Sequence, residues 1–503
     1  MVAHVLVFPF PAQGHLNSML KLAELLSLSA LHITFLTTDY HYHRLCLHSP
    51  THARLSRRPG FWFRSISDGL TDQRLRSADR ILELYESLTY NSSSLFRDLL
   101  ISNQNQNQHQ DWWPRITCLV VDGIMPFAID VANDLGIPTI AFRTSSPCSI
   151  WTYFSLPRLI QAGEFPFPFP AEEADLDERV YAVTGMESFL RRRDLPGFFR
   201  QARDISHPFL DFVYAVTLSS TRAKAFILNS FEAMDGTVLS HIRTVCPTTY
   251  AIGPLHSMLT SMSSHVLINS QSDQVLTNSA NLWQQDRSCL TWLDNQPKGS
   301  VLYVSFGSYT VITNEDLLEF WHGLVNSSQR FLWVIRSDLV NGVDKEGSPL
   351  PLLSVPPEVA EGTSKRGCVV AWAPQEEVLA HPSVGCFLTH SGWNSTLESV
   401  VAGVPMICWP FFVDQQITSR YVSEVWKIGL DMKDMHGREI VERMVRDAME
   451  GEKAQELKRS AAAMAEKAKE SITEGGSSHL NFQRLVHYLK STDDQDKDEI
   501  ILD

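Results

Sequence analysis

Short apolar runs that alternate with helical patterns are the feature of this sequence that most constrains its fold. In the first half these runs lie at residues 2–10, 32–37, 116–121 and 137–142. A helical pattern follows the first run from about His15, and another occupies residues 126–135. Strands that are apolar along their whole length are typical of parallel sheets covered by helices on both faces. The first half therefore predicts an α/β domain.

The same pattern starts again in the second half. Residues 300–308 form an apolar run that ends in a glycine turn, and further runs lie at 331–336, 367–371, 384–389 and 404–411. The length of 503 residues also favours two domains. The predicted organisation is an N-terminal Rossmann-like domain (1–255), a polar linker (256–285), a second Rossmann-like domain (286–480), and a C-terminal helix with an acidic tail (481–503).

Charge and cysteine content narrow the classes of function. The net charge of −14, without a block of Lys or Arg, argues against a nucleic-acid partner. Eight cysteines without a CxxC pair are typical of reduced thiols in the cytoplasm and not of a zinc site. The chain lacks a basic leader, and no apolar stretch approaches the roughly 18–20 residues that cross a bilayer, so we expect no membrane span.

Two doubly wound domains that face each other bring the carboxyl ends of both sheets to one cleft, where such folds bind ligands. After the run at 384–389, residues 389–398 pass from a strand through a turn into a helix. Free amides and the positive dipole end at a helix start suit a diphosphate. Asn394 and Ser395 add side-chain donors, and His390 can donate a charge-assisted bond. Taken alone, this stretch also fits a plain helix cap with a glycine turn.

A candidate catalytic pair lies in the first half. His15 follows the first strand where a helix begins, and a helix start favours the neutral imidazole that can accept a proton. Asp122 ends another strand and could bond the second ring nitrogen, which would fix the tautomer and stabilise the imidazolium as it forms. Without this context, a single His near a turn is more often structural.

Residues 372–415 read WAPQEEVLAHPSVGCFLTHSGWNSTLESVVAGVPMICWPFFVDQ. This 44-residue segment resembles the signature box of the plant family-1 UDP-glycosyltransferases. FPFPAQGHLN at the start, VVDG near 120 and FGS near 307 extend the similarity over the chain. The resemblance implies the GT-B fold, with an acceptor-binding N-terminal domain and a donor-binding C-terminal domain. It also implies a UDP-sugar co-substrate with no prosthetic group and no metal.

The resemblance assigns roles by position. The uracil-binding positions are Trp372, Ala373 and Gln375, and the ribose position is Glu398. The other expected UDP-binding residues, mainly at the phosphates, are His390, Trp393, Asn394, Ser395 and Ser308. Thr144, Asp414 and Gln415 match sugar-binding positions, and a closing Gln is loosely associated with glucose. His15 and Asp122 match the catalytic dyad of the family, which inverts the anomeric centre.

The acceptor site is less constrained by the sequence. Arg143 stands where Trp is more familiar in the family. Together with FRTSS and the arginines of 186–197, it is similar to a branch that acts on iridoid and other terpenoid aglycones. Arg143 either binds the carboxylate of an acidic acceptor or pairs with a structural Asp or Glu. The other candidate acceptor-binding residues are Phe10, Gly14, Ile124, Met125 and Phe189.

The sequence thus predicts a monomeric, cytoplasmic, inverting O-glucosyltransferase that uses UDP-glucose. The expected acceptor is a small lipophilic plant metabolite, such as a terpenoid or iridoid acid or alcohol. A flavonoid or other phenolic acceptor and a non-catalytic UDP-sugar-binding protein remain alternatives. A dinucleotide-dependent oxidoreductase is disfavoured, because PAQGH follows the first strand in place of G-x-G-x-x-G.

Overall fold

A computed structural model describes residues 2–71, 80–105, 113–168, 173–204, 206–268, 282–336, 338–339 and 355–498. Its N-terminal half contains a parallel seven-stranded sheet in the order β3-β2-β1-β4-β5-β6-β7. The strands are β1 (His4–Phe8), β2 (His32–Thr38), β3 (Phe61–Ile66), β4 (Cys118–Asp122), β5 (Thr139–Arg143), β6 (Ala225–Leu228) and β7 (Thr249–Ala251). The helices of this half are α1 (Gln13–Leu28), α2 (Asp39–His48), α3 (Pro50–Leu55), α4 (Ile81–Ser87), α5 (Ser93–Gln104), α6 (Pro126–Asp134), α7 (Pro147–Phe154), α8 (Leu156–Gln161), α9 (Glu173–Leu176), α10 (Gly197–Gln201), α11 (Pro208–Ser219), α12 (Glu232–Val245) and α13 (Leu255–Ile268).

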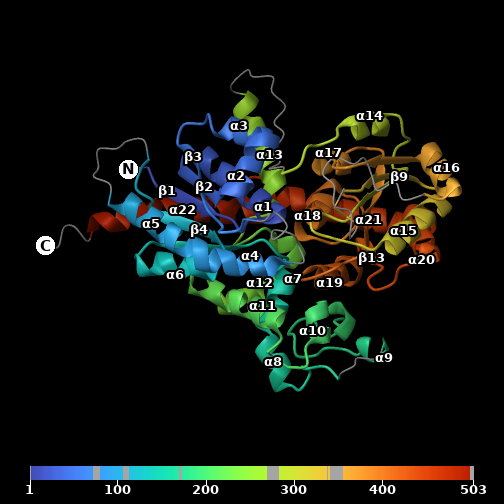
Figure 1. Ribbon diagram of the computed structural model, residues 1–503, viewed down its shortest axis with the longest axis horizontal. Coiled ribbons are helices and arrows are strands. Elements are labelled where there is room, and N and C mark those ends of the chain that lie inside the picture. Colours follow the sequence, from blue (N-terminus) through green and yellow to red (C-terminus); the bar gives the residue numbers. More distant parts are fainter. Residues whose placement is uncertain are drawn as a thin grey trace.

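The C-terminal half repeats this architecture with a parallel six-stranded sheet in the order β10-β9-β8-β11-β12-β13. Its strands are β8 (Val301–Ser305), β9 (Arg330–Val334), β10 (Gly367–Val370), β11 (Val384–Thr389), β12 (Met406–Cys408) and β13 (Gly429–Asp431). Its helices are α14 (Ser288–Asp294), α15 (Asn314–Asn326), α16 (Pro357–Arg366), α17 (Gln375–Leu379), α18 (Trp393–Ala402), α19 (Gln415–Arg420), α20 (Arg438–Met449), α21 (Gly451–Ile472) and α22 (Ser477–Asp498). The two halves lie side by side in Figure 1.

The central strands are buried on both faces, as their continuous apolar sequences predict. In β1, Val5 and Val7 pack with α1 on one face of the sheet, whereas Leu6 and Phe8 pack into the core on the other face. Successive side chains of a strand point to opposite faces, so an apolar run of this kind needs cover on both sides. The predicted α/β class is confirmed.

The strand order reverses between β1 and β4 in the first sheet and between β8 and β11 in the second. Ligands of doubly wound sheets bind at such switch points, outside the carboxyl ends of the strands. His15 lies just after β1 and Asp122 is the last residue of β4, while Ser308 follows β8 and His390 follows β11. Both switch points therefore carry candidate site residues.

The structure adds elements that the sequence patterns did not predict. Strands β3, β6, β7 and β13 were missed. In the predicted linker, α13 forms because Leu255, Met258 and Leu259 are buried in the core that α1 shares; residues 269–281 lie outside the described part of the chain.

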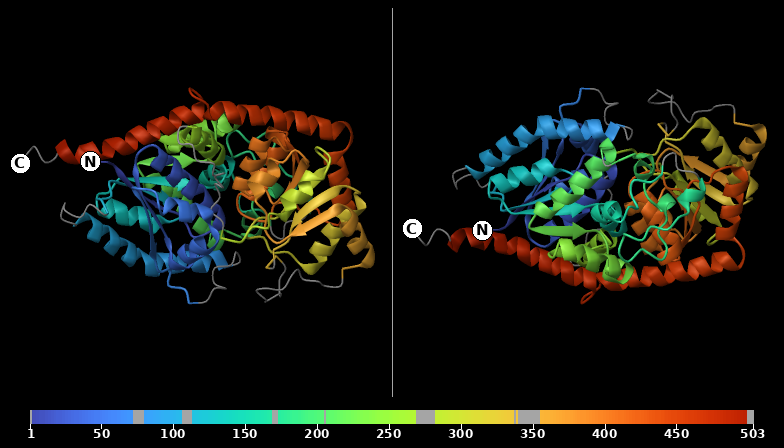
Figure 2. Two further views of the ribbon diagram at one scale, coloured as in Figure 1. Left: turned by 90° about the horizontal axis from the view of Figure 1, so that it is seen from above. Right: turned by 90° about the horizontal axis from the view of Figure 1, so that it is seen from below.

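Helix α22 returns from the C-terminal half to the first sheet, where Phe482, Leu485 and Leu489 join the core beside β1. Figure 2 shows α21 and α22 running along one side of both halves. The C-terminal helix therefore ties the two halves together, and the end of the predicted tail, 499–503, lies outside the described residues.

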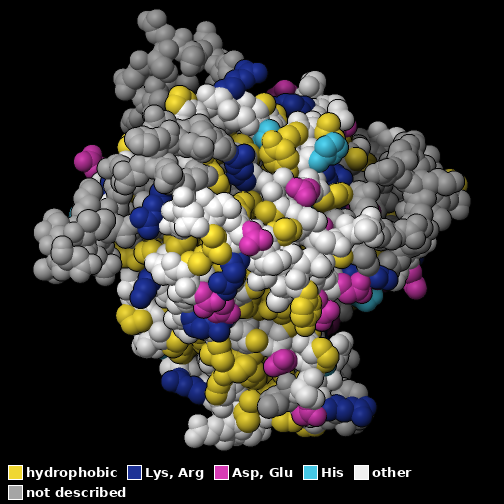
Figure 3. Space-filling view, turned by 60° about the vertical axis from the view of Figure 1, so that its left-hand side comes forward, with side chains coloured by type: hydrophobic (Ala, Val, Ile, Leu, Met, Phe, Trp, Pro, Cys, Tyr) yellow, Lys and Arg dark blue, Asp and Glu magenta, His cyan; other side chains and the backbone are white. Residues whose placement is uncertain are grey.

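One face of the molecule is shown in space-filling form in Figure 3. Basic and acidic side chains are interspersed on this face, and no continuous basic area is visible there.

Candidate active site

His15 and Asp122 are in direct contact, as the sequence predicts. Nδ1 of His15 lies 2.6 Å from Oδ2 of Asp122. The Asp122 side chain is fully buried, whereas His15 is partly exposed and lines the cleft between the two halves. Because Nδ1 is engaged by the carboxylate, Nε2 is the ring nitrogen left to act on a ligand. Oγ1 of Thr144 lies 2.9 Å from the same Nδ1.

The backbone around this pair holds the carboxylate in place. The amide of Phe10 donates to Oδ2 of Asp122 at 3.2 Å, and the amide of Ile124 donates to Oδ1 at 3.3 Å. The ring of Phe10 packs edge-on against His15, with 5.5 Å between the ring centroids. Phe10 thus supports the imidazole and does not line the acceptor cavity, which corrects its expected position.

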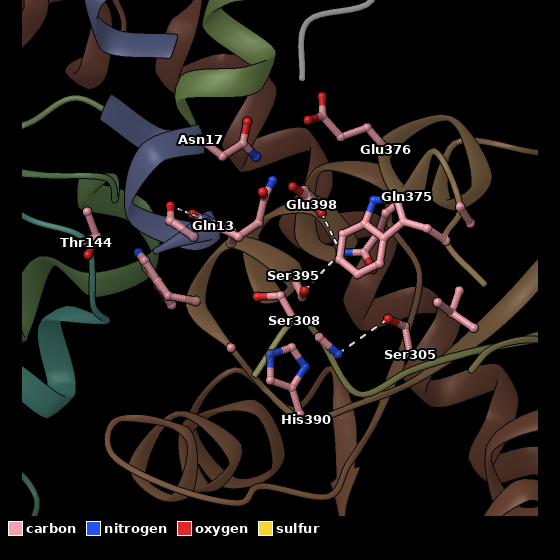
Figure 4. Close-up of a pocket in the computed structure, with 18 of the residues that line it drawn as sticks. Gln13, Asn17, Thr144, Ser305, Ser308, Gln375, Glu376, His390, Ser395 and Glu398 are labelled. Carbon is pink, nitrogen blue, oxygen red and sulfur yellow. Dashed lines mark hydrogen bonds between the residues drawn. The ribbon is translucent and has the colours of Figure 1, made fainter. Parts of the chain in front are cut away.

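A polar cavity lies where the two halves meet (Figure 4). All nine residues predicted to bind UDP line it, and so do Thr144 and Asp414. Its wall also includes Gln13, Asn17, Gln285 and Tyr303, which sequence reasoning did not single out. Figure 4 shows His390, Ser308 and Ser395 close together on the side of the C-terminal half, with Gln13 and Thr144 opposite. The signature segment and the first half therefore enclose one space.

The start of α18 is open toward this cavity. The helix begins at Trp393 after Gly392, which has no side chain that could cap its first amides. Uncapped amides at a helix start are suited to bind phosphate oxygens. Asn394 bridges to the other half, because its Nδ2 donates to the carbonyl oxygen of Gly14 at 2.8 Å and its Oδ1 accepts from Ser18 at 2.7 Å.

His390 lies beside this helix start in a half-buried position. Burial, and then the nearby charge of Arg336, lowers the pKa of His390 to about 4. Its Nδ1 has no hydrogen-bond partner among the described residues. The imidazole is therefore neutral in the ligand-free protein, and a neutral ring can donate an ordinary N–H hydrogen bond to a phosphate oxygen in place of the charge-assisted bond expected from the sequence. A side chain at Gly307 or Gly392 would overlap the His390 ring, which explains both glycines.

The nucleoside end of the cavity contains a linked set of polar groups. Nε2 of Gln375 donates to Oγ of Ser395 at 2.9 Å and to Oε2 of Glu398 at 2.7 Å. Burial raises the pKa of Glu398 to about 7, with a further contribution from Glu376. The indole of Trp372 lines the cavity and stacks on Trp283, with 4.8 Å between their centroids.

A second, apolar cavity opens from the first. The two share Gly14, His15, Ser145, Ser308, His390 and Asp414. One wall is a stripe on α11 made of Phe209, Phe212, Val213 and Val216. These residues are spaced i, i+3, i+4 and i+7, a helical signal that the sequence contains but that our sequence reasoning did not use. Other lining residues that were missed are Ile81, Tyr153, Tyr309, Phe412 and Val413.

Of the predicted acceptor residues, Gly14, Ile124 and Arg143 line this apolar cavity. Met125 is instead fully buried in the core of the first half. Phe189 packs edge-on against Tyr421 at 5.4 Å and belongs to the contact between the halves. Met125 and Phe189 therefore lie away from the expected position, because sequence proximity to a site residue does not fix the direction of a side chain.

The predicted sugar-binding residues lie near the junction of the two cavities. Burial raises the pKa of Asp414 to about 6. Gln415 lines the apolar cavity, and its Oε1 accepts from the amides of Phe411 and Phe412 at 2.8 and 3.2 Å. The side-chain NH₂ group is therefore the part of Gln415 that could bind a hydroxyl oxygen.

Comparison with known proteins identifies the family. A family model described as UDP-glucoronosyl and UDP-glucosyl transferase matches residues 261–459, and a glycosyltransferase N-terminal domain model matches residues 1–50. The chain is 50% identical over 491 residues to 7-deoxyloganetic acid glucosyltransferase from Catharanthus roseus, covering 98% of each chain. The chain belongs to the UDP-glycosyltransferase family.

Another relative of this UDP-glycosyltransferase is named for a different acceptor. Myricetin 3-O-rhamnoside 1,2-glucosyltransferase UGT709G2 from Crocosmia x crocosmiiflora is 48% identical over 489 residues, with 97% of this chain and 96% of that protein covered. Among solved structures, Os79 from O. sativa in complex with UDP is 29% identical, with a TM-score of 0.77 and coverage of 96% and 100%. The predicted GT-B fold is confirmed.

The protein is thus an enzyme that transfers a sugar from a UDP-sugar co-substrate to a small acceptor. Within the described residues, no helix combines the length and apolarity that a membrane crossing requires. The same residues contain no group of three or more His, Cys, Asp or Glu arranged to hold a metal ion.

Proposed function

We propose that this UDP-glycosyltransferase transfers glucose from UDP-glucose to a hydroxyl group of a small terpenoid of the iridoid type, with inversion at the anomeric carbon. The observation that carries the proposal is the meeting of the polar and apolar cavities at His15. A base at this junction can reach both a sugar in the first cavity and an acceptor in the second. The iridoid class is supported by the 50% identity to 7-deoxyloganetic acid glucosyltransferase.

In this proposal the donor occupies the polar cavity. Trp372 stacks on the uracil, Glu398 accepts from the ribose hydroxyls, and the diphosphate lies at the amides of Asn394 and Ser395. His390, Ser308 and the Asn394 side chain complete the phosphate site. The glucose then lies near Thr144, Asp414 and Gln415, on the side of the cavity that faces His15.

The chemistry follows from the His15–Asp122 contact. Nε2 of His15 takes the proton of the acceptor hydroxyl while its oxygen forms a bond to the anomeric carbon. The bond from that carbon to the UDP oxygen breaks in the same displacement, so an α-linked donor gives a β-glucoside. Asp122 stabilises the imidazolium that forms. The negative charge that develops on UDP is stabilised by the amides at the start of α18.

A flavonoid glycoside acceptor is the second candidate, because the Crocosmia relative is 48% identical and acts on such a compound by its name. Aromatic side chains from α11, together with Tyr153 and Tyr309, could also pack on a flavonoid ring. The iridoid proposal is preferred, because Arg143 adds a cation to the wall of the cavity, which suits an acidic acceptor.

Turnover of purified protein with UDP-glucose tests the proposal. The acceptor panel contains 7-deoxyloganetic acid, a simple terpenoid alcohol, myricetin and myricetin 3-O-rhamnoside, and products are identified by mass. We expect a single hexose addition and equimolar UDP release with 7-deoxyloganetic acid. Transfer only to the flavonoids would refute the iridoid class, and UDP-glucose binding without transfer to any acceptor would favour the non-catalytic alternative.

We further propose that the enzyme acts as a monomer in the cytoplasm. Residues from both halves of a single chain line the two cavities, so a second copy is not needed to complete them. All eight cysteines are unpaired, as expected in a reducing compartment. Light scattering of the purified protein tests the oligomeric state, and a dimer would refute the monomer. Imaging of a fluorescent fusion tests the localisation, and a signal outside the cytoplasm would refute the cytoplasmic location.

A further inference from the structure

Arg143 is a buried cation in the wall of the acceptor cavity. Only 2% of the residue is exposed, although it lines the cavity with His15 and the stripe on α11. Nη1 donates to the carbonyl oxygen of Val216 at 3.3 Å, while Nε has no hydrogen-bond partner among the residues that the structure describes. In the described part of the chain, no Asp or Glu oxygen lies within the 4.0 Å ion-pair distance of this guanidinium. A direct ion pair with a structural carboxylate, the alternative left open by the sequence, is therefore not formed, although Asp122 and Asp414 lie near enough for their charges to favour the guanidinium cation.

The backbone holds this side chain in position. A Cβ atom added to Gly123 would lie 2.5 Å from Cδ of Arg143 and 2.9 Å from Oγ of Ser220. The Ser220 hydroxyl contacts both the Gly123 and Val216 carbonyl oxygens, at 2.9 and 3.0 Å. The aliphatic stem of Arg143 thus passes directly over a glycine, and the guanidinium is fixed beside the cavity.

Tyr153 provides a second donor in the same wall. Its side chain is buried, its hydroxyl has no hydrogen-bond partner among the described residues, and it lines the cavity with Arg143. Burial raises the pKa of Tyr153 well above its ordinary value, so the hydroxyl keeps its proton. Burial lowers the pKa of Arg143, but a guanidinium remains a cation at neutral pH. The cavity wall therefore contains a buried cation and a neutral O–H donor, and among the described residues neither makes a direct contact with a carboxylate, although the charges of Asp122 and Asp414 act on the guanidinium from a greater distance.

We infer that Arg143 and Tyr153 bind a carboxylate of the acceptor while a separate hydroxyl of the same molecule faces His15. Unsatisfied buried donors favour an anionic ligand, and the planar guanidinium is suited to a carboxylate. The inference rests on the proposed acceptor cavity and deepens it, since it defines the acceptor as a hydroxy acid.

The carboxylate and the reacting hydroxyl of such an acceptor would bind at different places, because Arg143 and Thr144 are neighbours in sequence whose side chains reach different partners. Arg143 ends β5, and Thr144 directs its hydroxyl toward His15, whereas Arg143 reaches Val216 on α11. The recognised carboxylate therefore differs from the reacting oxygen. The product is expected to be an O-glucoside that retains its free acid, not a glucose ester.

Acid and ester acceptors test this inference. The wild type is assayed with 7-deoxyloganetic acid and its methyl ester, and with 4-hydroxycinnamic acid and its methyl ester. We expect kcat/KM to favour the acid in at least one pair. In Arg143→Met the acid-to-ester ratio should fall roughly 10- to 100-fold, which corresponds to the loss of a hydrogen bond to a charged group. Arg143→Lys should retain part of the ratio, and Tyr153→Phe should reduce it less than Arg143→Met.

The matched control is Arg97→Met on the surface of α5, where Arg97 pairs with Asp134; it should keep the wild-type ratio. Calorimetric binding of the acid to the UDP-loaded enzyme repeats the comparison without turnover. An equal preference for acid and ester in both pairs, an unchanged ratio in Arg143→Met, or a glucose-ester product would overturn the inference. Acid binding that depends on Arg143 without transfer would keep the inference and refute the proposed function.

Discussion

The affinity of the enzyme for UDP-glucose is expected to rise with pH between 6 and 8. In the proposed complex, Glu398 accepts hydrogen bonds from both ribose hydroxyls, and the ionised carboxylate is the better acceptor because neither of its oxygens carries a proton. Burial raises the pKa of Glu398 to about 7 in the ligand-free protein. At pH 6 most molecules therefore carry a protonated Glu398, and only a minority presents the better acceptor to UDP-glucose.

The size of the effect follows from this pKa. If only the ionised form binds, the apparent Kd is the intrinsic Kd divided by the ionised fraction. That fraction is roughly 0.1 at pH 6 and roughly 0.9 at pH 8 for a pKa of about 7. The Kd for UDP-glucose should thus fall roughly tenfold over this range. Asp414, with its pKa raised to about 6, contributes at most about twofold if it binds the glucose.

Isothermal titration calorimetry without an acceptor measures this dependence. UDP-glucose is preferred to UDP, because it lacks the terminal phosphate group that itself titrates in this range. Glu398→Gln removes the titrating carboxylate, so its Kd should be weaker than that of the wild type at pH 8 and nearly independent of pH. A wild-type Kd that does not change with pH, or a wild-type slope retained in Glu398→Gln, would refute the reasoning.

Three further predictions concern single residues. His15→Ala should lower kcat by about 10²–10⁴-fold, because the general base is lost, while the Kd for UDP-glucose stays within about twofold. Gly392→Ala should raise the Kd for UDP-glucose, because the added methyl group overlaps the His390 ring and displaces it. Lys433→Met should lower the melting temperature, because the buried Asp194 loses a counter-ion that lies 2.9 Å away at the contact between the halves.

Each of these variants has a control or a contradicting result. Gly197→Ala adds a methyl group into open space and should leave donor binding unchanged. Lys365→Met removes only an exposed ion pair and should hardly change the melting temperature. Near-normal turnover in His15→Ala would contradict its role as the base. Wild-type affinity for UDP-glucose in Gly392→Ala would contradict the role given to the position of His390. Equal melting temperatures for Lys433→Met and Lys365→Met would contradict the stabilisation of Asp194.

The fold could be predicted because its central strands are apolar along their whole length, as in β1 and β11. The missed strands lack that signal. Strand β6 has only four residues, and periodicity cannot distinguish so short an apolar run from a helix segment. Helix α13 was missed because its polar neighbours 269–285 dominate the composition of that region. Its burial depends on α1, which lies far away in the sequence.

The two cavities differ in how far the sequence defines them. Most donor residues fall within 372–415, where one strand–turn–helix unit places them together, and the expected set lines the polar cavity. The apolar cavity combines α4, α7, α11 and the loops at 309 and 412–413, so only tertiary packing brings its residues together. Met125 and Phe189 were misplaced for this reason. The catalytic and binding roles assigned to all these residues remain predictions.

A crystal structure of the enzyme with UDP-glucose, or with a non-transferable analogue, tests the central claim most directly. We expect phosphate oxygens within hydrogen-bond distance of the amides of Asn394 and Ser395. The anomeric carbon should face the junction of the two cavities, with Nε2 of His15 on the side opposite the departing UDP. A diphosphate bound elsewhere, or a sugar turned away from His15, would contradict the account.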